Sequence, residues 1–157
     1  MSILERSVSE DKIKQVDGDM MVTSLYTAGI AGERFLRSLQ QHGAIIGSYC
    51  PTCKKNFLPA RLFCERCLTR LSDTKTAPAE GRLKTFTKVY LDLDGQLLVQ
   101  PRIIGFIEFR GFEGGLIHEI SSDDEKKLKI GTKVTPRFLP QEKRKGSILD
   151  ISCFSVI

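Results

Sequence analysis

Long apolar segments are absent from this 157-residue chain, and no hydrophobic run approaches the roughly 18–20 residues that a membrane span requires. The first 19 residues also lack the apolar core of a secretory signal peptide, because they are polar and charged. Internal repeats and low-complexity tracts are missing as well. We therefore expect a globular protein of a reducing, cytoplasmic compartment, with no membrane partner.

Groups suited to nucleophilic or acid–base catalysis are few, since the chain holds two histidines and five cysteines. His42 falls at the end of a predicted helix. His118 lies between apolar neighbours in a predicted strand, which is typical of a packed core or rim histidine. Cys153 alternates with Leu149 and Ile151 on one strand face, which favours a buried structural thiol over a nucleophile. The sequence therefore disfavours intrinsic catalysis.

A strong excess of one charge is missing too. The formal net charge is +5, of which +4 falls in residues 50–78 and +2 in residues 79–157, while residues 1–49 carry −1. This modest excess is not the dense basic stripe expected of a protein that binds a phosphate backbone.

The most informative residues present are Cys50, Cys53, Cys64 and Cys67, which form two C-x-x-C knuckles with ten residues between them. Each knuckle turns tightly enough to aim two thiolates at one point, so the pattern predicts a tetrahedral Cys₄ zinc site. Four thiolates leave no open coordination position, so the Zn²⁺ is expected to be structural. Two disulfides or a redox C-x-x-C are less favoured alternatives.

An amphipathic helix is predicted from Thr27 onward, and Gly43 is well placed to end it. Its apolar stripe follows three- and four-residue steps through Ala28, Ala31, Phe35 and Leu39. A helix this short can pack on its own domain or dock on a partner, and the sequence leaves both interpretations open. Residues 1–24 have weak periodicity and are interpreted as an arm.

After the cysteines, the pattern changes to strands. The segment between the knuckles is long enough for a short hairpin, and the polar stretch 72–79 is interpreted as a linker. Turn and break signals at Asp94-Gly95, Pro101 and Gly114-Gly115 separate the strand-like runs that follow, and residues 123–128 form a charged, helix-competent insertion. The expected strands lie in 81–91, 103–109, 116–120, 132–139 and 147–156.

Five strands with a helical insertion between the third and fourth match the partly closed Greek-key barrel of the OB-fold. We therefore predict a mainly β protein. The expected parts are an N-terminal arm and helix (1–43), a zinc ribbon (44–71), a linker (72–79) and a five-stranded OB-fold domain (80–157).

Four segments stand in an informative order along the chain. They are the first knuckle in 47–53, the hairpin Phe57 to Arg61 before Cys64–Cys67, the strand in 81–87, and the Leu-x-Ile-Gly turn in 128–134. In this order they resemble the zinc-ribbon/OB-fold family that accompanies thiolases and related acyl-CoA enzymes. The resemblance runs from about Thr27 to the end of the chain. Lys54 and Ala60 depart from it, because the family often has glycine and a second proline at these positions.

The resemblance implies a non-catalytic accessory subunit that binds a thiolase-like protein and helps to position its CoA thioester. Cationic side chains would meet the CoA phosphates, and an aromatic ring would cover adenine or a partner's apolar patch. The candidate CoA or partner contacts are Phe57, Arg61, Phe63, Arg66, Arg82 and Lys84. Each basic residue also has a plainer interpretation, as a solvated charge that balances the zinc thiolates. The acyl group stays open among straight-chain, steroid-derived and aromatic thioesters such as benzoylsuccinyl-CoA.

A nucleic-acid-binding module is the alternative function, because zinc ribbons and OB-folds both often bind single strands. Phe86 and Tyr90 alternate with Lys84 and Lys88, as a stacking strip would require. The small net charge of residues 79–157 disfavours this interpretation.

Overall fold

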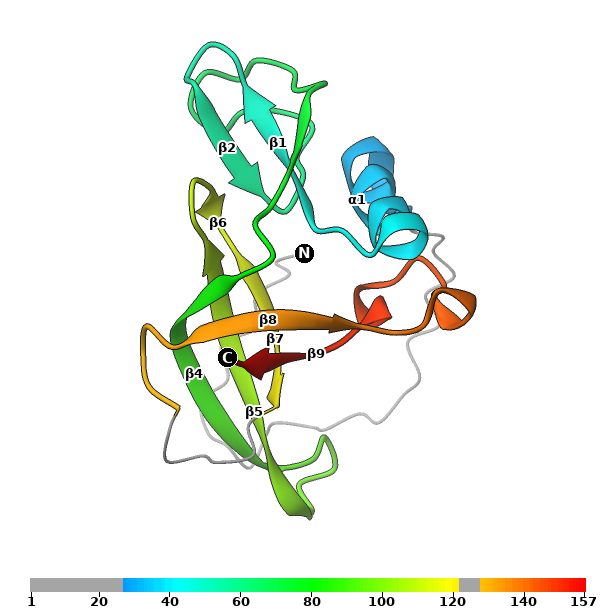
Figure 1. The fold of residues 1–157 in the computed structure, drawn as a ribbon, viewed down its shortest axis with the longest axis vertical. Coiled ribbons are helices and arrows are strands. Elements are labelled where there is room, and N and C mark those ends of the chain that lie inside the picture. The colour runs from blue at the N-terminus through cyan, green and yellow to red at the C-terminus, as the bar shows by residue number, and fades with distance from the viewer. Residues whose placement is uncertain (1–26, 122–127) are drawn as a thin grey trace, which may run out of the picture.

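The computed structural model describes residues 27–121 and 128–157. Within these residues the chain is mainly β, with one α-helix, a cysteine-bearing sheet and a closed five-stranded barrel (Figure 1). The fold class predicted from the sequence is therefore confirmed. The predicted arm (1–24) and nearly all of the predicted insertion (123–128) lie outside the described residues.

Helix α1 (Gly29–His42) carries the predicted apolar stripe from Ala31 onward and ends as predicted, while Ala28 precedes the helix as its N-cap residue. Gly43 has a left-handed conformation, with φ of 58°, and its N–H donates to the Leu39 carbonyl. Phe35 and Leu39 are buried in the same core cluster as the barrel residues, so this part of the stripe packs on its own chain. No helix among the described residues is long and apolar enough to cross a membrane.

The cysteine-bearing sheet, which we call the ribbon sheet, has the strand order β3-β1-β2-β6. Its strands are β1 (Ile46–Cys50), β2 (Lys55–Leu58), β3 (Thr74–Thr76) and β6 (Glu113–Gly114). β1 and β2 form a hairpin whose turn is the first knuckle, and Phe63 pairs with Arg70 across the second knuckle. The hairpin expected between the knuckles is therefore replaced by two hairpins, because each C-x-x-C turn itself reverses the chain. β3 lies within the expected linker and pairs with β1.

The barrel has the strand order β4-β5-β7-β9-β8, and β8 closes it by pairing with β4. Its strands are β4 (Gly81–Leu91), β5 (Leu97–Phe109), β7 (Leu116–Ser121), β8 (Lys133–Phe138) and β9 (Ile151–Val156). This order is the Greek key of an OB-fold. Fully buried side chains from four strands fill the centre, among them Leu83, Ile107, Val134 and Phe154.

The strand break predicted at Pro101 is wrong, because β5 runs through this residue. The register of β4 with β5 shifts here: Val89 pairs with Arg102, whereas Leu91 pairs with Leu97. The β5 residues between those pairs have no register partner on β4, so a proline without an N–H is tolerated.

The predicted buried face of the last strand is also wrong in part. The 3₁₀ turn η4 (Ile148–Asp150) precedes β9, and it leaves Leu149 71% exposed. A bulge follows, since Arg137 pairs with Cys153 while Phe138 pairs with Ile151. The extra residue interrupts the alternation, so Cys153 is half-buried.

Strand β6 ties the ribbon sheet to the barrel, near the turn predicted at Gly114-Gly115. It pairs in parallel with β2, and Gly115 N donates to the Leu58 carbonyl at 3.2 Å. A Cβ on Gly114 would lie 2.2 Å from that same carbonyl oxygen, and one on Gly47 of β1 would meet the Phe112 ring at 2.7 Å. Glycine therefore allows β6 to lie close to β2, and Phe112 to lie close to β1.

Candidate metal centre and adjoining cleft

The sulfur atoms of Cys50, Cys53, Cys64 and Cys67 all lie within 4.8 Å of one another. The Cys50–Cys67 and Cys53–Cys64 sulfur distances are 3.6 and 3.8 Å. A tetrahedral zinc with bonds of about 2.3 Å separates its sulfurs by about 3.8 Å, whereas a disulfide requires about 2.05 Å. All four cysteines are free, so the group is able to hold a metal ion such as zinc.

Backbone geometry aims the thiols inward. Lys54 and Leu68, which directly follow the second cysteine of each knuckle, have left-handed φ values of 54° and 59°. In the first knuckle, Cys53 N donates to Cys50 Sγ at 3.4 Å. In the second, the Thr69 hydroxyl lies 3.2 Å from Cys67 Sγ. Both contacts favour thiolates, the form in which cysteine binds metal.

The thiols differ in acidity without a bound ion. Hydrogen bonds from the side chain and backbone of Thr69 lower the pKa of Cys67 to about 6. Contact with Cys67, together with burial, raises the pKa of Cys53 to about 12. A divalent cation would deprotonate all four, because its charge stabilises each thiolate.

The core around these cysteines is small. It consists of Cys50, Cys64, Phe57 and Leu71, with Cys53 and Cys67 packed against it. So little apolar surface cannot hold a lobe together alone, so the ribbon would depend on a bound metal and on its contacts with the barrel.

The candidate contacts on the ribbon have different environments. Phe57 is 0% exposed and lies beneath the Arg61 guanidinium, 5.4 Å from the ring centroid, so its ring offers no face to a ligand. Phe63 is 53% exposed. The Arg61 side chain forms an ion pair with Glu65, and its backbone N donates to Ser48 Oγ.

Arg66 is held by Glu113 of β6, which also binds Lys55. Both cationic nitrogens lie 3.0 Å from the carboxylate. The Lys55 contact, with help from Arg66, lowers the pKa of Glu113. This three-residue cluster joins the second knuckle and β2 to β6.

Arg82 lies instead in a cleft of about 670 Å³ where β4 begins and β5 ends. The cleft is lined by Pro78, Ala79, Glu80, Gly81, Arg82, Glu108, Phe109, Arg110, Phe112 and Lys133. Lys84 lies beside it through an ion pair with Glu108, and Lys133 pairs with Glu80. Arg82 and Arg110 are exposed, and neither side chain has an ion pair or hydrogen bond within the described ranges.

Sequence reasoning found Arg82 and missed Arg110, Phe112 and Lys133. The strand register brings them together, since Arg82 pairs with Glu108 on one side and with Lys133 on the other. The sequence signal that could have identified Arg110 was its alternation with Glu108 on the polar face of β5. Combined with the expected pairing of β4 and β5, it would have placed Arg110 near Arg82.

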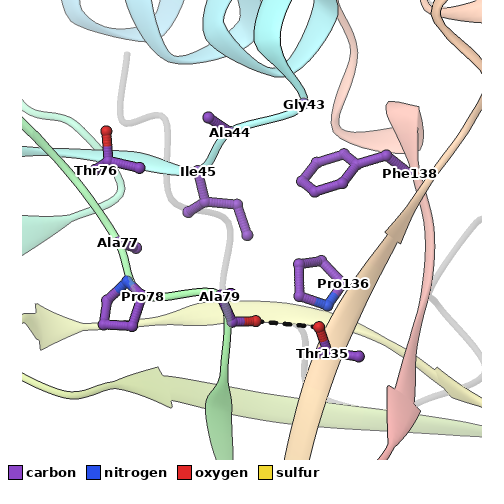
Figure 2. Close-up of a pocket in the computed structure, with 10 residues that line it drawn as sticks. All are labelled: Gly43, Ala44, Ile45, Thr76, Ala77, Pro78, Ala79, Thr135, Pro136 and Phe138. Atoms are coloured by element: carbon purple, nitrogen blue, oxygen red, sulfur yellow. Dashed lines mark hydrogen bonds between the residues drawn. The ribbon is translucent and has the colours of Figure 1, made fainter.

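A second, smaller crevice of about 240 Å³ lies between the end of α1, the segment before β4, and β8 (Figure 2). Figure 2 shows its mostly apolar wall and one hydrogen bond, from Thr135 Oγ1 to the Ala79 carbonyl at 3.1 Å. Ligand sites usually hold about 300–1,000 Å³, so the larger, cationic cleft is the better candidate for a nucleotide-sized molecule.

The residues considered for nucleic-acid binding or for catalysis are poorly placed for those functions. Phe86 is half-buried against the core, so only Tyr90 of the predicted stacking strip presents an open ring. His118 is buried, as predicted, with its ring edge against Phe154 and Nε2 3.4 Å from the Ile148 carbonyl. Cys153 Sγ lies 4.0 Å from Ser152 Oγ. These residues form no nucleophile–base pair among the described contacts.

Comparison with known proteins agrees with this architecture. The family model described as "ChsH2, C-terminal OB-fold domain" matches residues 74–139. A structure titled "Ltp2-ChsH2(DUF35) aldolase" is similar in fold, with 15% identity over 78% of this chain and 90% of that chain and a TM-score of 0.57. A search of the curated proteins found no match.

A more similar structure is a protein of unknown function from the DUF35 family of Sulfolobus solfataricus. It is 30% identical over 82% of this chain and 84% of that chain, with a TM-score of 0.64. The chain therefore belongs to the DUF35 family.

Proposed function

We propose that this protein is a non-catalytic accessory subunit of a cytoplasmic, thiolase-type acyl-CoA enzyme, and that it helps to bind the CoA end of the thioester. The cationic cleft beside the ribbon carries the proposal, because it offers two unpaired guanidinium groups next to an aromatic ring. One DUF35 protein, ChsH2, is named together with Ltp2 in an aldolase, which is consistent with an enzyme partner.

The cleft suits the phosphate end of CoA. Arg82 and Arg110 can each form charge-assisted hydrogen bonds to phosphate oxygens, and Phe112 adds an apolar surface for the adenine ring. Arg61, Arg66 and Lys84 already have carboxylate partners, so their contribution is secondary. Exposed Phe63 is better placed for a contact with the partner protein.

In this proposal the zinc site has a structural role and the enzyme partner supplies the catalytic groups. Zinc held by Cys50, Cys53, Cys64 and Cys67 would have no open coordination position, so it would supply rigidity. The nucleophilic cysteine and its bases would come from the enzyme partner. The five cysteines form no disulfide, which also suits a reducing compartment.

Kinetics of the reconstituted complex test the proposal. In a complex with a thiolase-type enzyme, Arg82→Ala and Arg110→Ala should each raise KM for the thioester about threefold to tenfold with little change in kcat, because uniform binding is lost. Arg137→Ala, which removes an exposed arginine of β8 outside the cleft lining, is the matched control. The chain alone should show no thiolytic turnover. A thiolase that is fully active without this chain and never associates with it would refute the proposal.

A further inference from the structure

The outer part of the β4–β5 hairpin, residues 87–102, extends past the barrel (Figure 1, lower end). We call these residues the arm from here on; they are not the N-terminal arm predicted at residues 1–24. Large apolar side chains cluster on it: Leu93 and Val99 are fully exposed, Leu97 is 80% exposed, and Tyr90 and Leu91 are each about half exposed. Single exposed apolar residues are normal on a protein surface, but a cluster of this kind marks an interaction site.

The strand edges of the arm are open as well. β4 pairs with β8 only at Gly81 and Arg82, and β5 pairs with β7 only from Ile104 to Ile107, so within the described residues the arm has no neighbouring strand on either side. Exposed edges with apolar side chains aggregate unless something covers them.

The tip of the arm has a fixed conformation. Asp92 Oδ1 accepts hydrogen bonds from the backbone N–H groups of Asp94 at 3.0 Å and Gln96 at 2.8 Å. Gly95 takes the positive φ of 76° that the turn requires. The turn therefore presents Leu93 between two carboxylates, and little conformational entropy is lost when it binds.

Charge identifies the kind of surface that fits the arm. The carboxylates of Asp92 and Asp94 stand at the end of an arm on a chain with net charge +5. They repel nucleic acid and anionic lipid, and they would repel each other if two arms met tip to tip. At the base, Arg102 is already paired with Glu119.

We propose that the arm docks into an apolar groove rimmed by lysine or arginine on the enzyme partner. The inference rests on the proposed function and adds the docking surface. The barrel then attaches to the enzyme through the arm, while the cleft lies where β4 begins and β5 ends, at the other end of the same two strands.

Affinity measurements between the purified chain and a thiolase-type enzyme from the same organism test the inference. Leu97→Asp should weaken binding at least tenfold, because it places a charge in the apolar contact. Asp94→Lys should also weaken binding, with a difference that shrinks at high salt, because it opposes the basic rim. Leu149→Asp makes the same apolar-to-acid change at an exposed site outside the arm and should leave binding unchanged. Zinc content and thermal midpoint verify that each variant is folded.

The outcomes separate the two proposals. If the unmodified chain binds and both arm variants bind equally well, the docking inference is overturned and the accessory function stands. If the unmodified chain does not bind, both proposals fall. Sedimentation with phosphatidylserine vesicles that is lost in Leu97→Asp would overturn the inference in favour of a lipid surface.

Discussion

Lys54 and Leu68 occupy equivalent positions, one residue past each knuckle, and both have a left-handed backbone. This conformation costs a residue with a Cβ roughly 1–2 kcal/mol. Glycine adopts it freely but loses more entropy on folding, which offsets part of the gain.

Lys54→Gly and Leu68→Gly should therefore each stabilise the folded protein by about 0.5–1 kcal/mol. Denaturant titration of the zinc-loaded protein measures the change. Thr87→Gly, at an exposed position of extended strand β4, should instead be destabilising by about as much. A loss of stability in both knuckle variants would show that the Lys54 and Leu68 side chains stabilise the fold by more than their left-handed backbone destabilises it.

The sequence predicted the cysteine cluster because a C-x-x-C turn is local, and its geometry needs no information from distant residues. It missed Arg110, because the partners of a strand residue depend on register. It wrongly placed Phe57 among surface candidates, because an apolar residue in a hairpin does not reveal which face is covered.

Among the elements, helix α1 and strand β4 were predictable, since their apolar residues repeat with the period of the structure, whereas the longer β5 was expected to break at Pro101. Strands β3 and β6 were not, because they are three and two residues long and exist only through pairing with β1 and β2. The start of β9 was predicted wrongly for a related reason. Ser147 and Asp150 form a capping box that begins a 3₁₀ turn, and this turn directs Leu149 outward.

Glu113 gives β6 a measurable pH dependence. Its contacts with Lys55 and Arg66 lower its pKa below the ordinary value of 4.5, so the carboxylate stabilises the fold above that pH. This stabilisation is lost as the pH falls through the lowered pKa, because protonation ends both ion pairs. Glu113→Gln should be less stable than the natural protein at neutral pH, and the difference should shrink on acidification.

Thermal unfolding from about pH 7 to pH 3 measures this convergence. Glu142→Gln, an exposed glutamate of η3 (Gln141–Lys143), is the control and should follow the natural protein at every pH. A gap that stays constant with pH would mean that Glu113 acts through shape rather than charge.

For the molecule as a whole, the ribbon sheet and the barrel are joined at β2 and β6. Leu58 of β2 is buried in the core cluster of the barrel, and β6 connects β5 to β7 along the chain. Loss of the metal should therefore lower the stability of the barrel as well as that of the ribbon. Cys50→Ser should abolish zinc binding, because a hydroxyl is a poor replacement for a thiolate, and it should lower the thermal midpoint of the entire chain.

Metal analysis should find about one zinc per chain in the natural protein and none in Cys50→Ser. Cys153→Ser should keep both the zinc and the midpoint, because Cys153 lies outside the cluster. A barrel that melts unchanged without zinc would show that the two parts are energetically independent.

The pairing of β6 with β2 also has a consequence for engineering. The ribbon sheet draws its strands from residues 46–58, from 74–76 and, after two barrel strands, from 113–114. No single cut separates it from the barrel. A fragment that stops after the second knuckle would lack two of the four strands of its sheet, and a barrel expressed alone would carry an orphaned β6. Chimeras between members of this family should therefore exchange residues 110–115 together with the ribbon, because the ribbon sheet keeps its matched fourth strand only when both segments come from the same parent protein.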